Sequence, residues 1–147
     1  MDWFNPFGLA FMLAIMIPNI IYAARHPDGF ASRWHNKTVE AIEQIGRYGC
    51  IALMLFNIPG TWFGWWADEA FALYLIVNTT LVILYCLTWM IGFQKQRMLR
   101  AVLLSVLPSL VFLFSAVMSR SVLLGLSALL FTPAHILISC KNTAFDQ

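Results

Sequence analysis

The chain has 147 residues, of which 61% are hydrophobic and 11% are charged, with a net charge of +2 and a mean hydropathy of +0.75. This composition excludes an ordinary water-soluble domain, because too few polar side chains remain to cover the surface of a folded chain. The small net charge argues against nucleic acid as a partner and makes membrane lipids the expected one.

Five apolar segments of membrane-crossing length follow one another along the chain. About 20 helical residues cross the hydrocarbon core of a bilayer, which is about 30 Å thick. The expected spans are residues 3–24, 45–66, 70–93, 101–118 and 121–140. The sequence therefore predicts an all-α integral membrane protein, a bundle of about five transmembrane helices that forms a single domain over residues 1–147.

The first span differs from a cleavable signal peptide. Asp2 stands where such a leader carries Lys or Arg, and Pro18 and Asn19 interrupt the short apolar run that it needs. We therefore expect the span to be retained, followed by a cytosolic connection over residues 25–39.

The second span begins with an amphipathic stretch that carries charge. Asn36 or Thr38 is suited to cap a helix there, and Glu43 and Arg47 are four residues apart with the acid first, the better order for an ion pair. Such a pair in the membrane should face protein, water or headgroups. Two interpretations stay open: an interfacial salt bridge whose Arg reaches lipid phosphate, and the charged entrance of a cavity between helices.

Two further features of this stretch concern packing. Gly46 and Gly49 share a stripe that would allow another helix to approach closely. Pro59, with Asn57 and Gly60, interrupts the span and leaves the carbonyl of Leu55 to be satisfied from elsewhere.

The boundary between the fourth and fifth spans is marked by Arg120 alone. One helix over residues 101–140 would be about 60 Å long, twice the hydrocarbon thickness. Two spans joined by a very tight turn, or a re-entrant pair, are therefore required.

The positions of Lys and Arg predict the orientation, because these residues are enriched in cytosolic connections. With five spans, one side of the membrane receives most of them: Arg25, Arg33, Lys37, Lys95, Arg97, Arg100 and Lys141. The other side receives only Arg120 together with Asp68 and Glu69. We expect the N-terminus outside, the C-terminus in the cytosol, and a multi-pass protein of the cell membrane.

The candidate site follows from polar residues at similar predicted depth. Six of them, including Cys86, fall in the inner half of the bilayer, and the other five are the predicted ligand-binding residues: Asn19, Tyr22, Glu43, Arg47 and His135. They would form one cluster if their helix faces converge. No catalytic motif, cofactor fingerprint or metal-ligand spacing accompanies them, so the sequence predicts no catalytic residue, no cofactor and no metal.

Three hypotheses for function remain. The first is a protein that binds or translocates a small amphiphilic or anionic molecule through a cytosol-facing intramembrane cavity, with Arg47 attracting the anion and Glu43 orienting Arg47. The second is a membrane-embedded enzyme acting on a lipid or lipophilic substrate, with Glu43 or His135 as general base. The third is an accessory subunit, or homo-oligomer, that docks through lipid-facing small residues, namely Gly92, Ser105, Ser109, Ser115, Ser119, Gly125 and Ser127.

In length, span number, predicted orientation and tryptophan content, the chain resembles the tryptophan-rich sensory or translocator proteins, which bind porphyrins and sterols. It lacks the Trp-x-Pro-Pro element of that family, and the nearest equivalent is residues 58–62, Ile-Pro-Gly-Thr-Trp. It is also similar in length to the small trimeric membrane enzymes of glutathione and eicosanoid metabolism, which have four spans. Neither resemblance assigns a site residue here.

Overall fold

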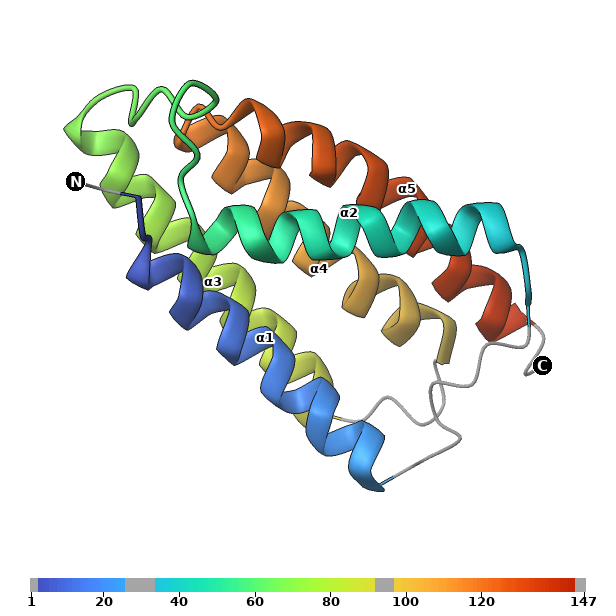
Figure 1. The fold of residues 1–147 in the computed structure, drawn as a ribbon. Helices are drawn as coiled ribbons and strands as arrows, with labels where there is room; N and C mark the ends of the chain where they lie inside the picture. The colour runs from blue at the N-terminus through green and yellow to red at the C-terminus, as the bar shows by residue number, and fades with distance from the viewer. Residues whose placement is uncertain (1–2, 26–33, 92–96, 145–147) are drawn as a thin grey trace.

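The computed structural model describes residues 3–25, 34–91 and 97–144, and within them the chain forms five α-helices (Figure 1). The helices are α1 (Pro6–Arg25), α2 (Lys37–Leu55), α3 (Asp68–Ile91), α4 (Arg97–Met118) and α5 (Val122–Ala144). The predicted all-helical architecture is therefore confirmed over the described residues. Most of the predicted connection 25–39, including Arg33, and Gly92 and Lys95 lie outside them.

Four of the helices, α1, α3, α4 and α5, are long and apolar enough to cross a membrane. The shortest, α1, has 20 residues and is therefore about 30 Å long, which matches the hydrocarbon thickness. The chain is thus a membrane-compatible helical bundle with several spans. The fifth crossing, by α2, stays a prediction because this helix carries Lys37, Glu40, Glu43 and Arg47.

Helix α2 begins earlier and ends earlier than the predicted span 45–66. Asn36 caps it, since its side-chain oxygen accepts hydrogen bonds from the backbone N–H groups of Thr38 and Val39 at 3.2 and 3.3 Å. The helix ends at Leu55, before the extended residue Phe56. The prediction counted the tryptophan-rich segment after Pro59 as part of the span, because hydropathy registers apolar side chains whether or not the backbone is helical.

Successive helices run in opposite directions, so that the bundle has two distinct ends (Figure 1). The basic end contains Arg25, Lys37, Arg100 and Lys141. The aromatic end contains the residues that follow α2, with Trp62, Phe63, Trp65 and Trp66. This separation of charge agrees with the charge pattern from which orientation was predicted, while the assignment of the basic end to the cytosol stays a prediction.

Helices α4 and α5 form a hairpin with a very tight turn. Arg120 adopts a left-handed backbone conformation with φ 49°, and the N–H of Ser121 donates to the carbonyl of Ala116 at 3.0 Å. The Arg120 guanidinium lies 4.9 Å from the centre of the Trp66 ring, and Trp66 Nε1 donates to the carbonyl of Val117 at 2.7 Å. The predicted separation of two helices at Arg120 is confirmed.

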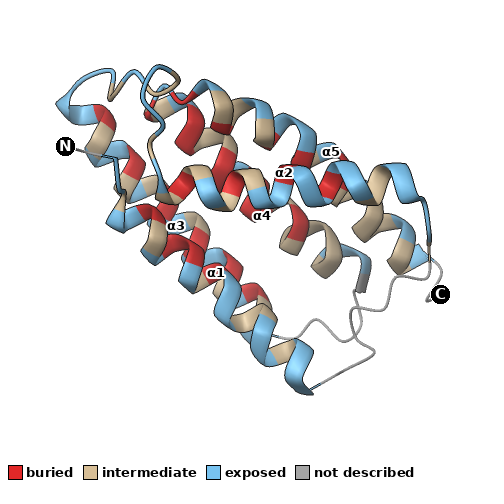
Figure 2. Cartoon of the chain, viewed as in Figure 1, coloured by how far each residue is buried: buried red, intermediate tan, exposed pale blue. Residues whose placement is uncertain are grey.

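The helices pack in the spatial order α2, α5, α4, α3, α1, and α1 returns to contact α2. Figure 2 shows the buried residues between neighbouring helices and the exposed ones on their outer faces. The α1–α2 contact lies at the aromatic end, where Asn5 N–H donates to the carbonyl of Leu55 at 2.8 Å. This bond satisfies the carbonyl that the helix-ending segment leaves free. Toward the basic end, α1 and α2 diverge (Figure 1).

The serines of α4 line the interior of the bundle. Ser105, Ser109, Ser115 and Ser119 are all buried, and Asn78 Nδ2 on α3 donates to Ser115 Oγ at 2.9 Å. Their expected role in a lipid-facing docking surface is therefore wrong for these four residues. A serine hydroxyl can donate a hydrogen bond to a carbonyl of its own helix, as Ser109 Oγ does to the carbonyl of Ser105 at 2.8 Å. Serines can therefore be buried without a polar partner on a neighbouring helix.

Candidate functional site

The site lies where α2 crosses α5, and two glycines make that crossing close. A Cβ atom added at Gly46 would lie 2.6 Å from the backbone nitrogen of Phe131, and one added at Gly49 would lie 2.6 Å from Ser127 Oγ. No ordinary side chain fits at Gly46 without moving the backbone of α5. The predicted packing role of these glycines is confirmed, and their closeness brings side chains of α2 within hydrogen-bonding reach of α5.

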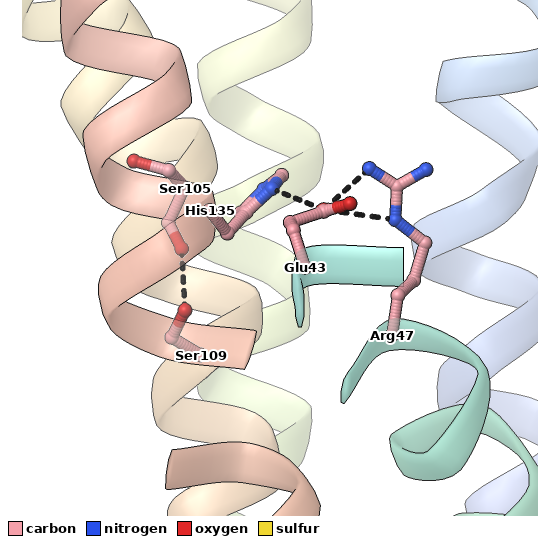
Figure 3. Close-up of polar contacts among 5 residues, drawn as sticks. All are labelled: Glu43, Arg47, Ser105, Ser109 and His135. Atoms are coloured by element: carbon pink, nitrogen blue, oxygen red, sulfur yellow. Dashed lines mark hydrogen bonds and ion pairs between the residues drawn. The ribbon is translucent and has the colours of Figure 1, made fainter. Parts of the chain in front are cut away.

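Glu43 lies at the centre of the site, between His135 and Arg47 (Figure 3). Its Oε1 atom is 2.9 Å from His135 Nδ1 and accepts a hydrogen bond from Arg47 Nε at 3.0 Å. Arg47 Nη2 donates to the same oxygen. The predicted ion pair between Glu43 and Arg47 is therefore present, and His135 joins it from α5.

The contact with Glu43 indicates which nitrogen of His135 carries a proton. An ionised carboxylate only accepts hydrogen bonds, and the two N–H groups of Arg47 favour the ionised form of Glu43. His135 Nδ1 must then carry a hydrogen, and in the neutral imidazole Nε2 is the unprotonated nitrogen. The His135 ring is also stacked on Phe131, with ring centres 4.5 Å apart and planes 21° apart, so that its orientation is held from two sides.

The three side chains differ in their access to the surroundings. The side chain of Glu43 is 4% exposed, that of His135 is 23% exposed and that of Arg47 is 47% exposed. The carboxylate is therefore enclosed by protein, whereas the guanidinium reaches the surface of the bundle. Arg47 uses two of its nitrogens on one carboxylate oxygen and has further N–H donors on that more open side.

The depth of the site follows from its position along α5. His135 is about 14 Å from the last residue of that helix and about 20 Å from the first, at 1.5 Å per residue. Along α5, which is long and apolar enough to cross a membrane, the trio therefore lies within the length of the helix, nearer the basic end. A charge at such a depth is costly unless it is paired, and charges of this kind mark functional sites in many membrane proteins.

Asn19 and Tyr22, the other two predicted site residues, belong to a second cluster between α1 and α3. Tyr85 Oη on α3 donates to Asn19 Oδ1 at 2.9 Å, and Asn19 Nδ2 donates to the carbonyl of Ile15 at 3.1 Å. The Tyr22 and Trp89 rings have centres 4.9 Å apart. The expected single cluster is thus divided into two pairs of helices, because α1 diverges from α2 toward the basic end (Figure 1).

Sequence reasoning missed three residues that contribute to these clusters. Tyr85 is the partner of Asn19, and Arg100 on α4 lies 4.8 Å above the Trp89 ring. Phe131 stacks on His135. The four-residue spacing of Phe131 and His135 on one helix face was a usable signal, whereas nothing in the sequence pairs Tyr85 with Asn19.

A surface hollow lies at the opposite end of the bundle. Its volume is about 290 Å³, and it is lined by Trp65, Ala67, Asp68 and Phe71. It therefore does not extend the site at Glu43. Within residues 3–25, 34–91 and 97–144, no group of three or more His, Cys, Asp and Glu side chains is arranged to hold a metal ion.

Comparison of the chain with protein-family models, with curated proteins and with solved structures gives no match. The interpretation of the site therefore depends on its own geometry and chemistry.

Proposed function

We propose that this small polytopic membrane protein binds or translocates a small amphiphilic or anionic molecule, whose anionic group contacts Arg47. The observation that supports this most directly is an enclosed carboxylate that holds a half-exposed guanidinium beside an apolar helix of membrane-crossing length. Glu43 restrains Arg47 and His135 restrains Glu43, so the guanidinium is oriented before a ligand arrives. An oriented Arg suits carboxylate, sulfonate and phosphate groups, which accept its parallel N–H donors.

An amphiphile fits the surroundings of Arg47 better than a fully hydrated ion. Ile51 lies one turn beyond Arg47 on the same face of α2 and is only partly buried, so an apolar tail could lie along α2 while the anionic group contacts the guanidinium. Ligand and protein would then satisfy each other's charge where water is scarce. The same arrangement would admit an anionic lipid from the leaflet at the basic end.

The proposal is tested with decyl sulfonate, an amphiphile whose headgroup keeps one negative charge across the neutral pH range. Binding is measured by calorimetry on the purified protein in nanodiscs of zwitterionic lipid, with empty nanodiscs as the reference. We expect Arg47→Met to weaken binding at least tenfold, since a charge-assisted hydrogen bond contributes about 1.5–3 kcal/mol. Because Arg47→Met leaves Glu43 without its partner, the double variant Glu43→Gln with Arg47→Met is measured beside it.

The matched control is Arg120→Gln, which removes one positive charge at the aromatic end, where the guanidinium lies on Trp66. It should bind decyl sulfonate as the unmodified protein does. Equal weakening by the Arg47 and Arg120 substitutions would indicate general surface attraction and would contradict the proposal. So would unchanged binding in the folded double variant.

The contact between Glu43 and His135 also favours a second candidate, a membrane-embedded hydrolase acting on lipid. A carboxylate 2.9 Å from Nδ1 fixes the imidazole with Nε2 available as a general base. Hydrolysis of a short-chain nitrophenyl ester by the nanodisc protein tests this. The double variant Glu43→Gln with His135→Ala should abolish turnover, and turnover that survives in it would rule out a hydrolase that uses these two residues.

A further inference from the structure

We infer that the site takes up a proton together with the anion, with His135 as the proton acceptor. This inference depends on the proposed function and concerns how the same site keeps its charge balanced. The ligand class that it names is a monovalent organic anion bound with one H⁺. Its basis is the charge of the trio and the place of the trio within the bundle.

With His135 in its neutral form, the trio carries no net charge before a ligand binds. Glu43 carries one negative charge, Arg47 carries one positive charge, and neutral His135 donates its Nδ1 hydrogen to Glu43. An anion placed on Arg47 would leave a net negative charge in surroundings of low polarity, where unbalanced charge is costly. A proton added at His135 Nε2 restores neutrality and turns the contact with Glu43 into an ion pair.

No other charged group in the described residues is placed to balance the anion instead. Two helices pack closely on α5, namely α2 and α4. On α2, Lys37 and Glu40 lie in the first turn, and Glu40 Oε1 is 3.3 Å from His35 Nδ1 outside the helix. On α4, Arg100 lies over the rings of Trp89 and Tyr22, and on α5 itself Lys141 lies in the last turn. Among the charged side chains of the described residues, Glu43 is the one in contact with His135, and Arg47 in turn contacts Glu43.

The two groups that could accept the proton differ in exposure. The side chain of His135 is 23% exposed, whereas that of Glu43 is 4% exposed. The imidazole is therefore the more open of the two, while the carboxylate is enclosed by protein. Thermodynamic linkage then requires that the anion binds more tightly as pH falls, because the protonated form of His135 is the form that the anion stabilises.

The test uses decyl sulfonate again, since its headgroup does not titrate near neutral pH and any proton taken up must come onto the protein. Calorimetry of binding in two buffers with different heats of ionisation gives the number of protons taken up per anion. We expect up to one proton per anion, and affinity that rises up to tenfold per unit fall in pH where His135 is neutral before binding. Phosphate amphiphiles are avoided because they titrate themselves.

Two variants distinguish His135 from other proton acceptors. His135→Gln should show the weak affinity that the unmodified protein has at high pH, with no proton uptake and no dependence on pH. Glu43→Gln should bind without proton uptake, because its trio already carries a net positive charge that the anion balances. The second variant keeps the test decisive if the first does not fold.

The outcomes separate this inference from the proposed function. Binding that requires Arg47 but takes up no proton in the unmodified protein would overturn the inference and leave the proposed function standing. Proton uptake that persists in His135→Gln would also overturn it. Binding that is unaffected by Arg47→Met would instead contradict the proposed function itself.

Discussion

At the scale of single residues, Glu43 and Arg47 form one ion pair but are buried to different extents, so that losing its partner should cost Glu43 more than Arg47. Glu43 is enclosed and has no route to water, whereas the half-exposed side chain of Arg47 can extend toward headgroups when its partner is removed. The pair is therefore asymmetric. Removing Arg47 should leave a buried carboxylate with only His135, and removing the charge of Glu43 should leave a guanidinium that can still find an anion.

The first prediction concerns this asymmetry and is a double-mutant cycle. Arg47→Met should lower the free energy of unfolding by about 2–4 kcal/mol, because it leaves the enclosed carboxylate of Glu43 without its main partner. Adding Glu43→Gln should recover much of that loss, since the unpaired charge is then gone. Reversible unfolding in mixed micelles of mild and denaturing detergent measures both.

Glu43→Gln alone is the reference for this cycle, because it retains the size of the side chain and an oxygen that accepts hydrogen bonds. It should cost less than Arg47→Met. If the double variant lost as much stability as the two single variants lose together, the two side chains would not interact energetically, despite the 3.0 Å contact.

The sequence predicted this residue pair and placed His135 at a similar depth, but it could not establish that His135 contacts Glu43. Glu43 and Arg47 are four apart on one helix, and helical geometry alone brings them together. His135 lies 92 positions from Glu43, and its contact depends on how α2 crosses α5. Two polar residues at a similar predicted depth can equally belong to different interfaces, as Asn19 does with Tyr85.

At the scale of elements, the crossing of α2 and α5 decides whether the site exists. Gly46 lies beside the backbone of Phe131, and Gly49 lies beside the side chain of Ser127. Phe131 is four residues before His135, so a shift of α2 away from it would also move Glu43 away from the imidazole. Packing of small residues therefore positions the charged trio, although it supplies none of its chemistry.

The second prediction compares alanine substitutions at three glycines, whose added Cβ atoms would contact different atoms. Gly46→Ala should destabilise the protein by about 1–3 kcal/mol, because the Cβ meets backbone that cannot rotate away. Gly49→Ala should cost less, since Ser127 Oγ can turn aside. Thermal unfolding in a mild detergent gives the order, and binding of decyl sulfonate should weaken along with stability at Gly46.

Gly125→Ala is the matched control on α5. Its new Cβ would lie 3.8 Å from the Cβ of Ala116, an ordinary contact, and alanine favours a helix over glycine by about 1 kcal/mol. This variant should be as stable as the unmodified protein or more so. If Gly46→Ala behaved in the same way, the close approach of α2 to α5 would not hold in the protein.

The end of a helix was predictable from the sequence where the apolar segment and the helical backbone end at the same residue. The predicted span 101–118 and α4 end at the same residue, Met118, because a polar and tightly turned segment follows. The end of α2 was missed, since the chain stays apolar through Trp66 although the helix ends at Leu55, before the extended residue Phe56. Gly60 has φ 83°, a conformation that glycine adopts readily.

At the scale of the whole molecule, the two ends of the bundle differ in charge and in aromatic content, as expected of a protein that crosses a membrane. The basic end contains Arg25, Lys37, Arg100 and Lys141, whereas the aromatic end contains a single basic residue, Arg120, beside exposed Trp66. Lys and Arg are favoured on the cytosolic side, and Trp is favoured at the interfaces. The orientation follows only if α2 crosses the bilayer, because four crossings would place the two chain ends on the same side.

The third prediction tests that crossing by labelling cysteines. In a background with Cys50, Cys86 and Cys140 changed to alanine, single cysteines are placed at two exposed positions that flank α2, Lys37 at the basic end and Ala67 at the aromatic end. A maleimide that cannot cross membranes should label the cysteine at position 67 in intact cells, and should label the one at 37 only after the membrane is opened. Both variants must bind decyl sulfonate normally, which shows that the bundle is intact. Labelling of both positions from the same side of the membrane would mean that α2 does not cross it, and the depth assigned to Glu43, on which the cost of its charge depends, would then be wrong.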